Sequence, residues 1–243
     1  MPINCKNCPL RRHELFATMS SDDVAFMQDM KQGEQHVAPG TVVFSQGDKP
    51  DHLYTVLEGK GLRHKTLPDG RRQVVNFVMP GDFIGLQAGV MGEMRHAVEA
   101  TTAMTLCIFN RSDLWKVFQN NPSRAYDLTY LAAIEEHLLG DALSRMGQHG
   151  ARERVAWSLH RLYRRDVAIG AVAGDGSISL PFRQQDLADA LGLSLVHTNK
   201  TLAQLKAENV ARWERRRLFV HQPETLAQIG LVEQLQPETR PLM

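Results

Sequence analysis

The stretch from Phe182 to Ala207 constrains the fold of this chain more than any other part of it. Its first half places small and apolar side chains on one helical face, and Gly192 follows where the chain has to turn. Ser194 is a favourable N-cap residue for a second helix, in which apolar side chains recur every three or four positions. The pattern predicts two short helices joined by a tight turn, a helix–turn–helix. An ordinary helical hairpin in a core is the alternative.

The second of these helices has two faces of different chemistry. One face is apolar and is expected to pack in the core. The opposite face carries short polar and basic side chains, which a helix in the major groove of DNA needs in order to reach base edges. Residues 210–220 then predict two short strands around a basic turn, a wing whose arginines would contact phosphates. The residues expected to pack in the core are Leu195, Thr198, Leu202 and Leu205. The predicted DNA-binding residues are Arg183, Gln184, Ser194, Val196, His197, Asn199, Lys200, Arg215, Arg216 and Arg217.

Charge is distributed unevenly along the 243 residues, whose formal net charge is only +1. Residues 150–221 contain 12 Lys and Arg against 7 Asp and Glu, so this part is basic and the remainder is acidic. A basic region suits a polyanionic partner such as double-stranded DNA. The length suits two domains. No apolar run approaches the roughly 20 residues of a membrane span, and no signal peptide is present, so we predict a cytoplasmic protein with no membrane partner.

Residues 38–113 have the texture of a β domain. Short runs at 41–44, 53–57, 73–78 and 105–109 predict strands, and Asp69-Gly70 predicts a hairpin turn. Many short strands at this spacing indicate a sandwich or roll. At the mouth of such a roll, a glycine-bearing loop with basic side chains could form a small anion pocket, and a surface loop with a solvated arginine is the alternative. The candidate pocket residues are Gly85, Arg95 and His96.

Three cysteines, a low and odd number, argue against a disulfide framework. Cys5 and Cys8 have a spacing that suits shared metal ligation, whereas Cys107 lies in a predicted strand, where a buried thiol acts as a small hydrophobe. An iron–sulfur cluster normally has four thiolate ligands, so His13, Glu14 or a second subunit would have to complete the shell. Reactive thiols without a metal and inert thiols are the alternatives.

A proline-free segment from Arg124 to Met146 predicts a helix more than roughly 30 Å long, at about 1.5 Å per residue. Pairing with the same helix of a second subunit, as a two-stranded coil, would bury its apolar stripe, and packing only on its own roll is the alternative. Gly147 to Gly150 form a predicted hinge, and the next helix is expected from Ala151 to Arg165. The predicted dimer-interface residues are Leu128, Leu131, Ile134, Leu138, Ala142 and Met146.

The order of these parts resembles the Crp/Fnr family of bacterial transcription regulators, over about residues 16–230. Three motifs carry the resemblance: Leu53 to Gly59 together with Pro80 to Gly85, the helix start at Glu153 and Arg154, and the run from Gln185 to Leu193. The resemblance implies an α+β fold with a cyclic-nucleotide-binding-like β-roll, a long dimerisation helix and a C-terminal winged helix–turn–helix. The corresponding domains are 1–118 for the N-terminal segment and roll, 119–149 for the helix and hinge, 150–230 for the winged domain and 231–243 for a tail.

The resemblance also implies partners. It predicts a homodimer that binds a two-fold symmetric DNA site and contacts RNA polymerase, with the loop from Ile169 to Ser177 as a candidate polymerase surface. Relatives that bind cyclic AMP have a glutamate where this chain has Leu86, and a serine or threonine where it has His96, so cyclic AMP is disfavoured.

Two further departures from the family pattern concern the thiols and the DNA. The three cysteines resemble part of the set used by the oxygen-sensing branch, but one N-terminal ligand is absent. No cofactor is therefore assigned, an iron–sulfur cluster stays open, and a haem bound by Pro2 or a histidine is conceivable. Val196 and Lys200 stand where well-known members have a glutamate and an arginine, so we predict a different DNA half-site, with Asn199 able to pair with adenine.

The sequence offers no nucleophile–base pair, no phosphate-binding glycine loop and no paired acids, so an enzyme is not expected. We predict a homodimeric, sequence-specific DNA-binding transcription regulator whose signal is sensed in the roll or by the N-terminal cysteines. A ligand-binding or scaffold protein without specific DNA binding is the alternative. Within the family, the alternative is a constitutively active regulator without an effector.

Overall fold

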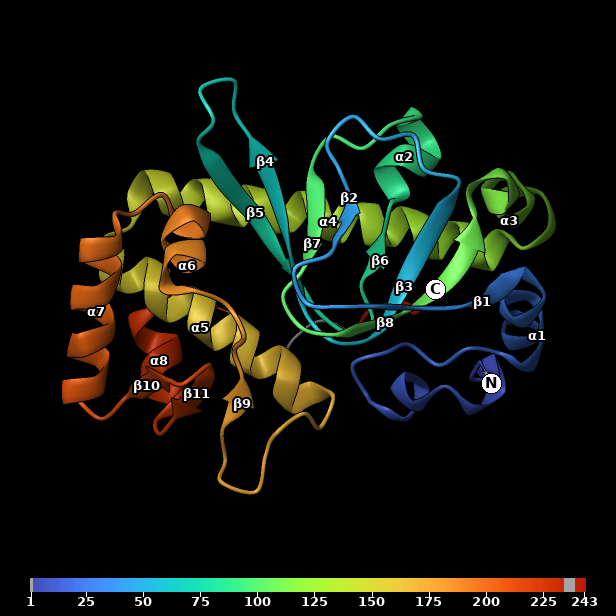
Figure 1. Cartoon of the computed structure of the whole chain (residues 1–243). Helices are drawn as coiled ribbons and strands as arrows, with labels where there is room; N and C mark the ends of the chain where they lie inside the picture. Colours follow the sequence, from blue (N-terminus) through green and yellow to red (C-terminus); the bar gives the residue numbers. More distant parts are fainter. Residues whose placement is uncertain (1, 234–238) are drawn as a thin grey trace. The chain divides into compact units, whose positions relative to one another are not determined.

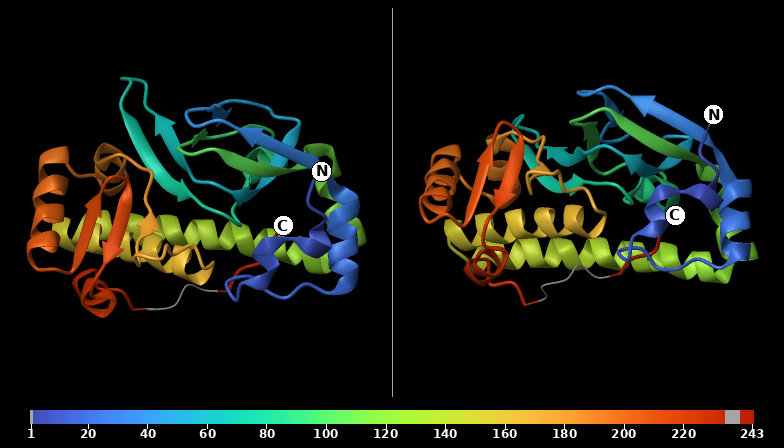
Figure 2. Two further views of the ribbon diagram at one scale, coloured as in Figure 1. Left: turned by 60° about the horizontal axis from the view of Figure 1, so that its bottom comes forward. Right: turned by 90° about the horizontal axis from the view of Figure 1, so that it is seen from below.

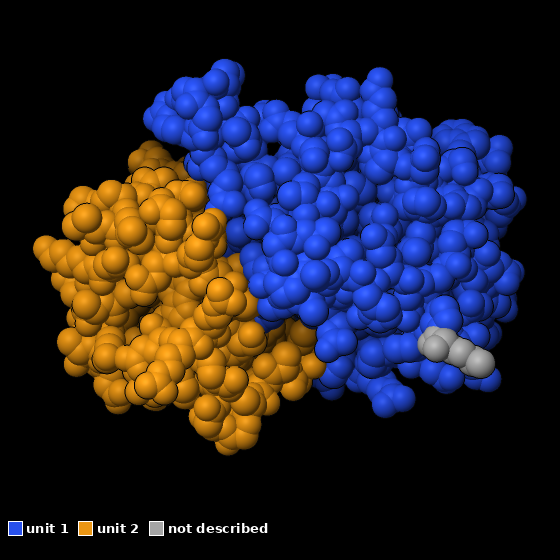
Figure 3. All heavy atoms as spheres, in the orientation of Figure 1, with its two compact units in different colours: residues 1–136, 239–243 blue, residues 137–238 orange. Residues whose placement is uncertain are grey.

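The computed structural model describes residues 2–233 and 239–243 (Figure 1). It divides into two compact units, which are described separately (Figure 3). Unit 1 comprises residues 1–136 and 239–243, and unit 2 comprises residues 137–238. The predicted tail, residues 231–243, includes residues 234–238, which lie outside the described part of the chain.

Unit 1 is built around two four-stranded antiparallel sheets. These sheets form the predicted β-roll. Its core is formed by apolar side chains such as Phe44, Val56, Val98 and Leu106. The first sheet has the order β1-β8-β3-β6 and the second has the order β2-β7-β4-β5. The strands are β1 (Lys31–Val37), β2 (Val42–Phe44), β3 (His52–Glu58), β4 (Gly61–Thr66), β5 (Arg72–Val78), β6 (Phe83–Ile84), β7 (Ala97–Ala100) and β8 (Met104–Asn110).

The hairpin between β4 and β5 turns at the predicted place. The Gly70 amide donates to the Leu67 carbonyl over 2.9 Å, and Gly70 has a φ of +81°, a conformation that glycine adopts without strain. Unit 1 also contains short helices. They are η1 (Cys5–Asn7), η2 (Pro9–Arg12), α1 (Ser21–Met30), α2 (Leu86–Met91), η3 (Arg111–Asp113) and α3 (Leu114–Asn120).

Helix α4 (Pro122–Gln148) is the predicted long helix, and it runs from unit 1 into unit 2. Leu128 and Leu131 are 2% and 4% exposed, because the first half of α4 packs them into unit 1. The prediction that these two residues line a subunit interface is therefore wrong, since a single chain already buries them. Ile134, Leu138, Ala142 and Met146 are half-buried.

A different face of α4 is exposed in the single chain. Tyr126 and Leu143 are each 69% exposed and Leu139 is 48% exposed, although all three side chains are largely apolar. Ala132, Ala133 and Gly140 lie between them and are also exposed. This face has an apolar stripe at the spacing of a helix that packs against another helix.

Unit 2 contains the predicted winged helix–turn–helix. Arg145, near the end of α4, donates to the Gly230 carbonyl over 2.8 Å, and its guanidinium stacks on Trp157 at 5.0 Å. The three-stranded sheet has the order β10-β11-β9. The elements are α5 (Ala151–Ala168), β9 (Ile178–Ser179), α6 (Gln184–Leu191), α7 (Leu195–Ala207), β10 (Ala211–Glu214), β11 (Arg217–Val220) and α8 (Pro223–Ile229).

The segment Thr239–Met243, here called the return segment, belongs to unit 1 although residues 137–233 belong to unit 2. Phe16 and Arg240 form a parallel β-bridge, so the return segment lies beside the N-terminal segment, as Figure 2 shows. Within residues 2–233 and 239–243, no helix combines the length and the apolar composition that crossing a membrane requires.

Candidate nucleic-acid interface and sensor sites

The turn of the helix–turn–helix is made by Gly192 and Ser194. Gly192 follows α6 with a φ of +62°, and the Leu193 amide donates back to the Ala188 carbonyl over 3.0 Å. Ser194 caps α7, because the His197 amide donates to its hydroxyl over 3.2 Å. The Ser194 side chain therefore stabilises the first turn of α7.

The buried face of α7 is formed by Thr198, Thr201 and Leu205, which are at most 4% exposed. Leu195 is 39% exposed, so the prediction that it packs in the core is wrong. It is the first residue of α7, and the buried residues of this helix follow from Thr198 onward. Leu202 is half-buried. The sequence interpretation missed Thr201, because a threonine gives no apolar signal at that position.

The opposite face of α7 is open to solvent. Val196 is 77% exposed, and His197, Asn199 and Lys200 are exposed beside it. The structure therefore brings these four predicted residues together on one face of one helix. Such a surface offers a methyl contact, an amide that can pair with adenine, and a cation for guanine or phosphate.

The N-terminal end of α6 carries Arg183, which is tied to a buried carboxylate. The Arg183 guanidinium approaches Asp186 at 2.8 Å, and the Arg183 amide also donates to that carboxylate over 2.8 Å. The Asp186 side chain is 2% exposed and that of Arg183 is 66% exposed. Asp186 holds Arg183 at the protein surface and partly balances its charge. Gln184, the next residue, is half-buried.

The wing consists of β10 and β11 joined by a turn of two arginines. Arg215 and Arg216 have φ values of +49° and +61°, and Glu214 pairs with Arg217 to close the hairpin. A two-residue turn of this kind favours Asn-Gly, because side chains are strained at positive φ. Backbone strain of this kind is typical of functional positions.

Arg217 is engaged within unit 2. Its guanidinium donates to the Ser177 hydroxyl over 2.6 Å and lies 3.1 Å from the Asp175 carboxylate. The hydrogen bonds from Ser177, with the Arg217 guanidinium, hold the pKa of Asp175 below its usual range. The wing therefore presents Arg215 and Arg216 at its tip, while Arg217 fastens the loop before β9.

The interior of the roll carries paired charges. Arg63 on β4 is 6% exposed, and its guanidinium lies 2.6 Å from Glu135 on α4. Glu99 on β7 lies 3.4 Å from Arg72 and 3.6 Å from the His64 ring. A buried charge is tolerated when it is paired, as Arg63 is with Glu135, whereas the Arg72 and Glu99 side chains are partly exposed.

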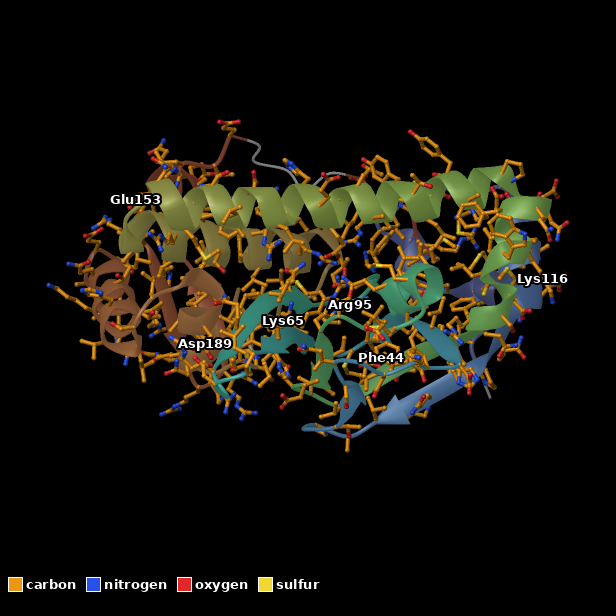
Figure 4. All side chains as sticks on the ribbon, turned by 90° about the horizontal axis from the view of Figure 1, so that it is seen from above. Phe44, Lys65, Arg95, Lys116, Glu153 and Asp189 are labelled. Atoms are coloured by element: carbon orange, nitrogen blue, oxygen red, sulfur yellow. The ribbon has the colours of Figure 1, made fainter. Side chains whose placement is uncertain are left out.

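The three candidate pocket residues meet different surroundings. Gly85 has a φ of +95° and packs closely against Leu53 and Phe44, the latter labelled in Figure 4, so a side chain there would be strained and would displace these neighbours. Arg95, also labelled there, is 56% exposed and pairs with Glu93 at 2.8 Å. His96 is half-buried, and its burial, together with the Arg63 and His64 charges, lowers its pKa to about 4.

Cys5, Cys8 and Cys107 line one small, mostly apolar cavity in unit 1. Lys31 lies on the same cavity, and its ammonium donates to the Ile3 carbonyl over 2.6 Å. Burial raises the pKa of Cys107 to about 11, although Lys31 acts in the opposite direction, and burial also raises the pKa of Cys5. Thiols of this kind are mainly protonated at neutral pH and react slowly.

This cavity does not fit an iron–sulfur cluster. Its volume is about 30 Å³, which is room for one or two water molecules. Neither His13 nor Glu14 lines it, and in the described residues no group of three His, Cys, Asp or Glu is placed to hold a metal ion. A lysine ammonium beside the thiols is also a poor substitute for a fourth ligand.

Comparisons with known proteins agree with this architecture. Residues 34–121 match the cyclic nucleotide-binding domain, and residues 153–229 match the Crp-like helix-turn-helix domain. The chain is 30% identical over 215 residues to the transcriptional activator protein FnrL of Cereibacter sphaeroides, covering 88% of this chain and 86% of FnrL. It is 32% identical to the nitrogen fixation regulation protein FixK of Bradyrhizobium diazoefficiens, covering 83% of each.

The chain belongs to the Crp/Fnr family of transcription regulators. The solved structure of FixK2 from Bradyrhizobium japonicum, 28% identical, matches with a TM-score of 0.72 over 81% of this chain and 96% of FixK2. Crp/Fnr proteins are DNA-binding regulators and not enzymes, so the predictions of the fold, the family and the regulatory class are confirmed.

Sequence interpretation missed several residues of these sites. Arg63 and Glu135 pair across the fold, and no local pattern links a strand arginine to a carboxylate on a distant helix. Lys31 is the first residue of β1, a strand of mostly polar residues, so its place beside the thiols gave no signal in the sequence.

Proposed function

We propose that this Crp/Fnr regulator acts in the cytoplasm as a homodimer on a two-fold symmetric DNA site, and that α7 and the wing tip of unit 2 make the contacts. The observation that carries the proposal is the exposed face of α7, with Val196, His197, Asn199 and Lys200 side by side. Two such helices related by a two-fold axis would read half-sites about one DNA turn, roughly 34 Å, apart.

Lys200→Ala tests the reading face directly. If Lys200 contacts a base, its loss should cost about 1–3 kcal/mol on the matched site and little on a site changed at that base. If it contacts phosphate, binding should weaken on all sequences and the salt slope should fall by about 1. Gln148→Ala, at the exposed end of α4, is the matched control. No effect of Lys200→Ala at either of two salt concentrations would remove Lys200 from the interface.

The proposed dimer uses the exposed face of α4 and not the predicted set that includes Leu128 and Leu131. Tyr126, Leu139 and Leu143 support this choice, because they leave a large apolar surface open in a single chain. Leu143→Glu should convert a dimer into a monomer in sedimentation equilibrium, whereas Lys65→Glu on β4, a residue labelled in Figure 4, should not. An unchanged dimer in Leu143→Glu would place the interface elsewhere.

The signal and the contact with RNA polymerase concern other parts of the chain. Leu86 and His96 stand where relatives that bind cyclic AMP have a glutamate and a serine or threonine. Arg63 in the roll already has Glu135 as its counter-ion. Both observations support a regulator that does not respond to cyclic AMP. We infer that this chain contacts RNA polymerase through the loop from Ile169 to Ser177, because it is similar to FnrL, which is named a transcriptional activator. Calorimetry with cyclic AMP, and transcription with loop variants, test these two inferences.

A further inference from the structure

The chain leaves unit 1 after residue 136 and re-enters it at the return segment, Thr239–Met243. Unit 2 is therefore connected to unit 1 at two places along the chain. The return segment adds a short parallel β contact to the N-terminal segment: the Arg240 amide donates to the Leu15 carbonyl over 2.9 Å, and the Ala17 amide donates to the Arg240 carbonyl over 2.9 Å.

Side chains strengthen this contact. The Arg240 guanidinium lies 3.0 Å from the Asp82 carboxylate, and the two side chains are 7% and 2% exposed. Asp82 is itself positioned by the Met79 amide, which donates to it over 2.8 Å. A buried ion pair with further hydrogen bonds is a specific contact, since either partner alone would be a buried charge.

The last two residues of the return segment accept hydrogen bonds from other side chains of unit 1. Arg124 on α4, 4% exposed, donates to the Leu242 carbonyl over 3.2 Å, and the Thr55 hydroxyl donates to the backbone oxygen of Met243. Leu242 and Met243 are 4% and 8% exposed. The segment is thus embedded in unit 1 and is not a surface strand.

The embedded residues form part of the wall of the cysteine cavity. Leu242 and Met243 line it together with Cys5, Cys8 and Cys107. Thr55 on β3, which binds Met243, is the direct cross-strand partner of Cys107 on β8. The position of the return segment and the access to the thiols therefore depend on the same few contacts.

We propose that the return segment is an internal ligand of unit 1 that closes the cysteine cavity, so that displacement of the segment exposes the thiols. By reciprocity, any apolar or thiol-directed molecule that needs the space of Leu242 and Met243 favours the displaced state of the segment.

Labelling of Cys107 with N-ethylmaleimide tests the closure. The thiol adds across the maleimide double bond, so a carbon–sulfur bond forms, the thiol proton moves to the neighbouring carbon and nothing is lost. Site-resolved mass spectrometry should find labelling about ten-fold faster in a chain that ends at residue 238, and also faster in Met243→Ala, because local opening no longer has to displace the segment. Arg152→Ala, which removes an exposed pair with Glu208 in unit 2, should leave the rate unchanged.

A peptide in trans separates release from misfolding. Adding the peptide Thr-Arg-Pro-Leu-Met to the shortened chain should restore slow labelling of Cys107, and the same peptide with alanine for arginine should not, since it cannot pair with Asp82. Equal labelling of Cys107 in the full chain, the shortened chain and Met243→Ala would overturn the closure.

Discussion

Arginines at one site in each unit have different surroundings. In the roll, Arg63 is buried and paired with Glu135, whereas Arg215 and Arg216 sit at the tip of the wing in a strained turn. A neutralised cation contributes to a fixed interior, and a cation held at the surface remains available to a polyanion. The contrast supports the proposal that unit 2 binds the polyanion, although the net charge of the whole chain is nearly neutral.

The largest expected effect on stability concerns His96 in the roll. His96 has a pKa of about 4, lowered by burial and by the Arg63 and His64 charges, against about 6.5 in an unfolded chain. Above pH 6.5 the ring is neutral in both states and its contribution is complete; between pH 6.5 and 4 only the unfolded chain takes up the proton. Stability should therefore fall by up to about 3 kcal/mol over that range.

Denaturant unfolding of wild type and His96→Gln at pH 7, 5.5 and 4.5 measures this contribution. The variant should lose part of the pH dependence, and His52→Gln, an exposed histidine at the start of β3, is the matched control. Parallel pH profiles for wild type and His96→Gln would show that His96 takes no part in the acid sensitivity.

The next effect concerns the buried pair itself. Arg63→Ala should lower the free energy of unfolding by about 2 kcal/mol, less than for a fully buried pair because the Glu135 side chain is 28% exposed. The salt dependence of DNA binding should stay the same, because Arg63 is already neutralised within the fold. A changed salt slope in Arg63→Ala would mean that the roll contributes directly to the polyanion surface.

The smallest expected effect on stability concerns the wing and has the opposite sign. Replacing Arg215-Arg216 by Asn-Gly should stabilise unit 2 by about 1 kcal/mol, because both residues favour positive φ. The same change should weaken DNA binding and lower the salt slope by about 2, close to 0.9 per lost phosphate contact. Arg71→Gln, at the exposed hairpin of the roll, is the control and should change neither. Unaltered DNA affinity in the Asn-Gly variant would remove the wing tip from the interface.

Local signals explain what the sequence predicted. Gly192, Ser194 and Asp69-Gly70 act over a few residues through backbone conformation and capping, so the helix–turn–helix and the hairpin could be predicted in place. The apolar spacing predicted the length of α4 but not which of its faces meets the roll. Leu128 and Leu131 share a stripe with Leu138 and Met146, and only the fold decides that the first pair is buried within unit 1.

Contacts between distant parts of the chain could not be predicted in this way. Strand β1 has no regular alternation, so the element that carries Lys31 to the thiols left no pattern. The return segment is too short for any periodicity, and its place in unit 1 depends on Asp82 and Arg124, which lie in other elements. These contacts in unit 1 join distant parts of the chain, whereas the proposed DNA-reading face lies on a single helix.

Selection of binding sites from a random double-stranded DNA pool tests the reading surface most directly. The full-length protein should enrich a two-fold symmetric sequence whose half-sites are centred about one helical turn apart, and Lys200→Ala should relax the preference at one position in each half-site if Lys200 reads a base. Enrichment of no sequence, or of a single half-site without symmetry, would contradict a homodimer that reads DNA through α7.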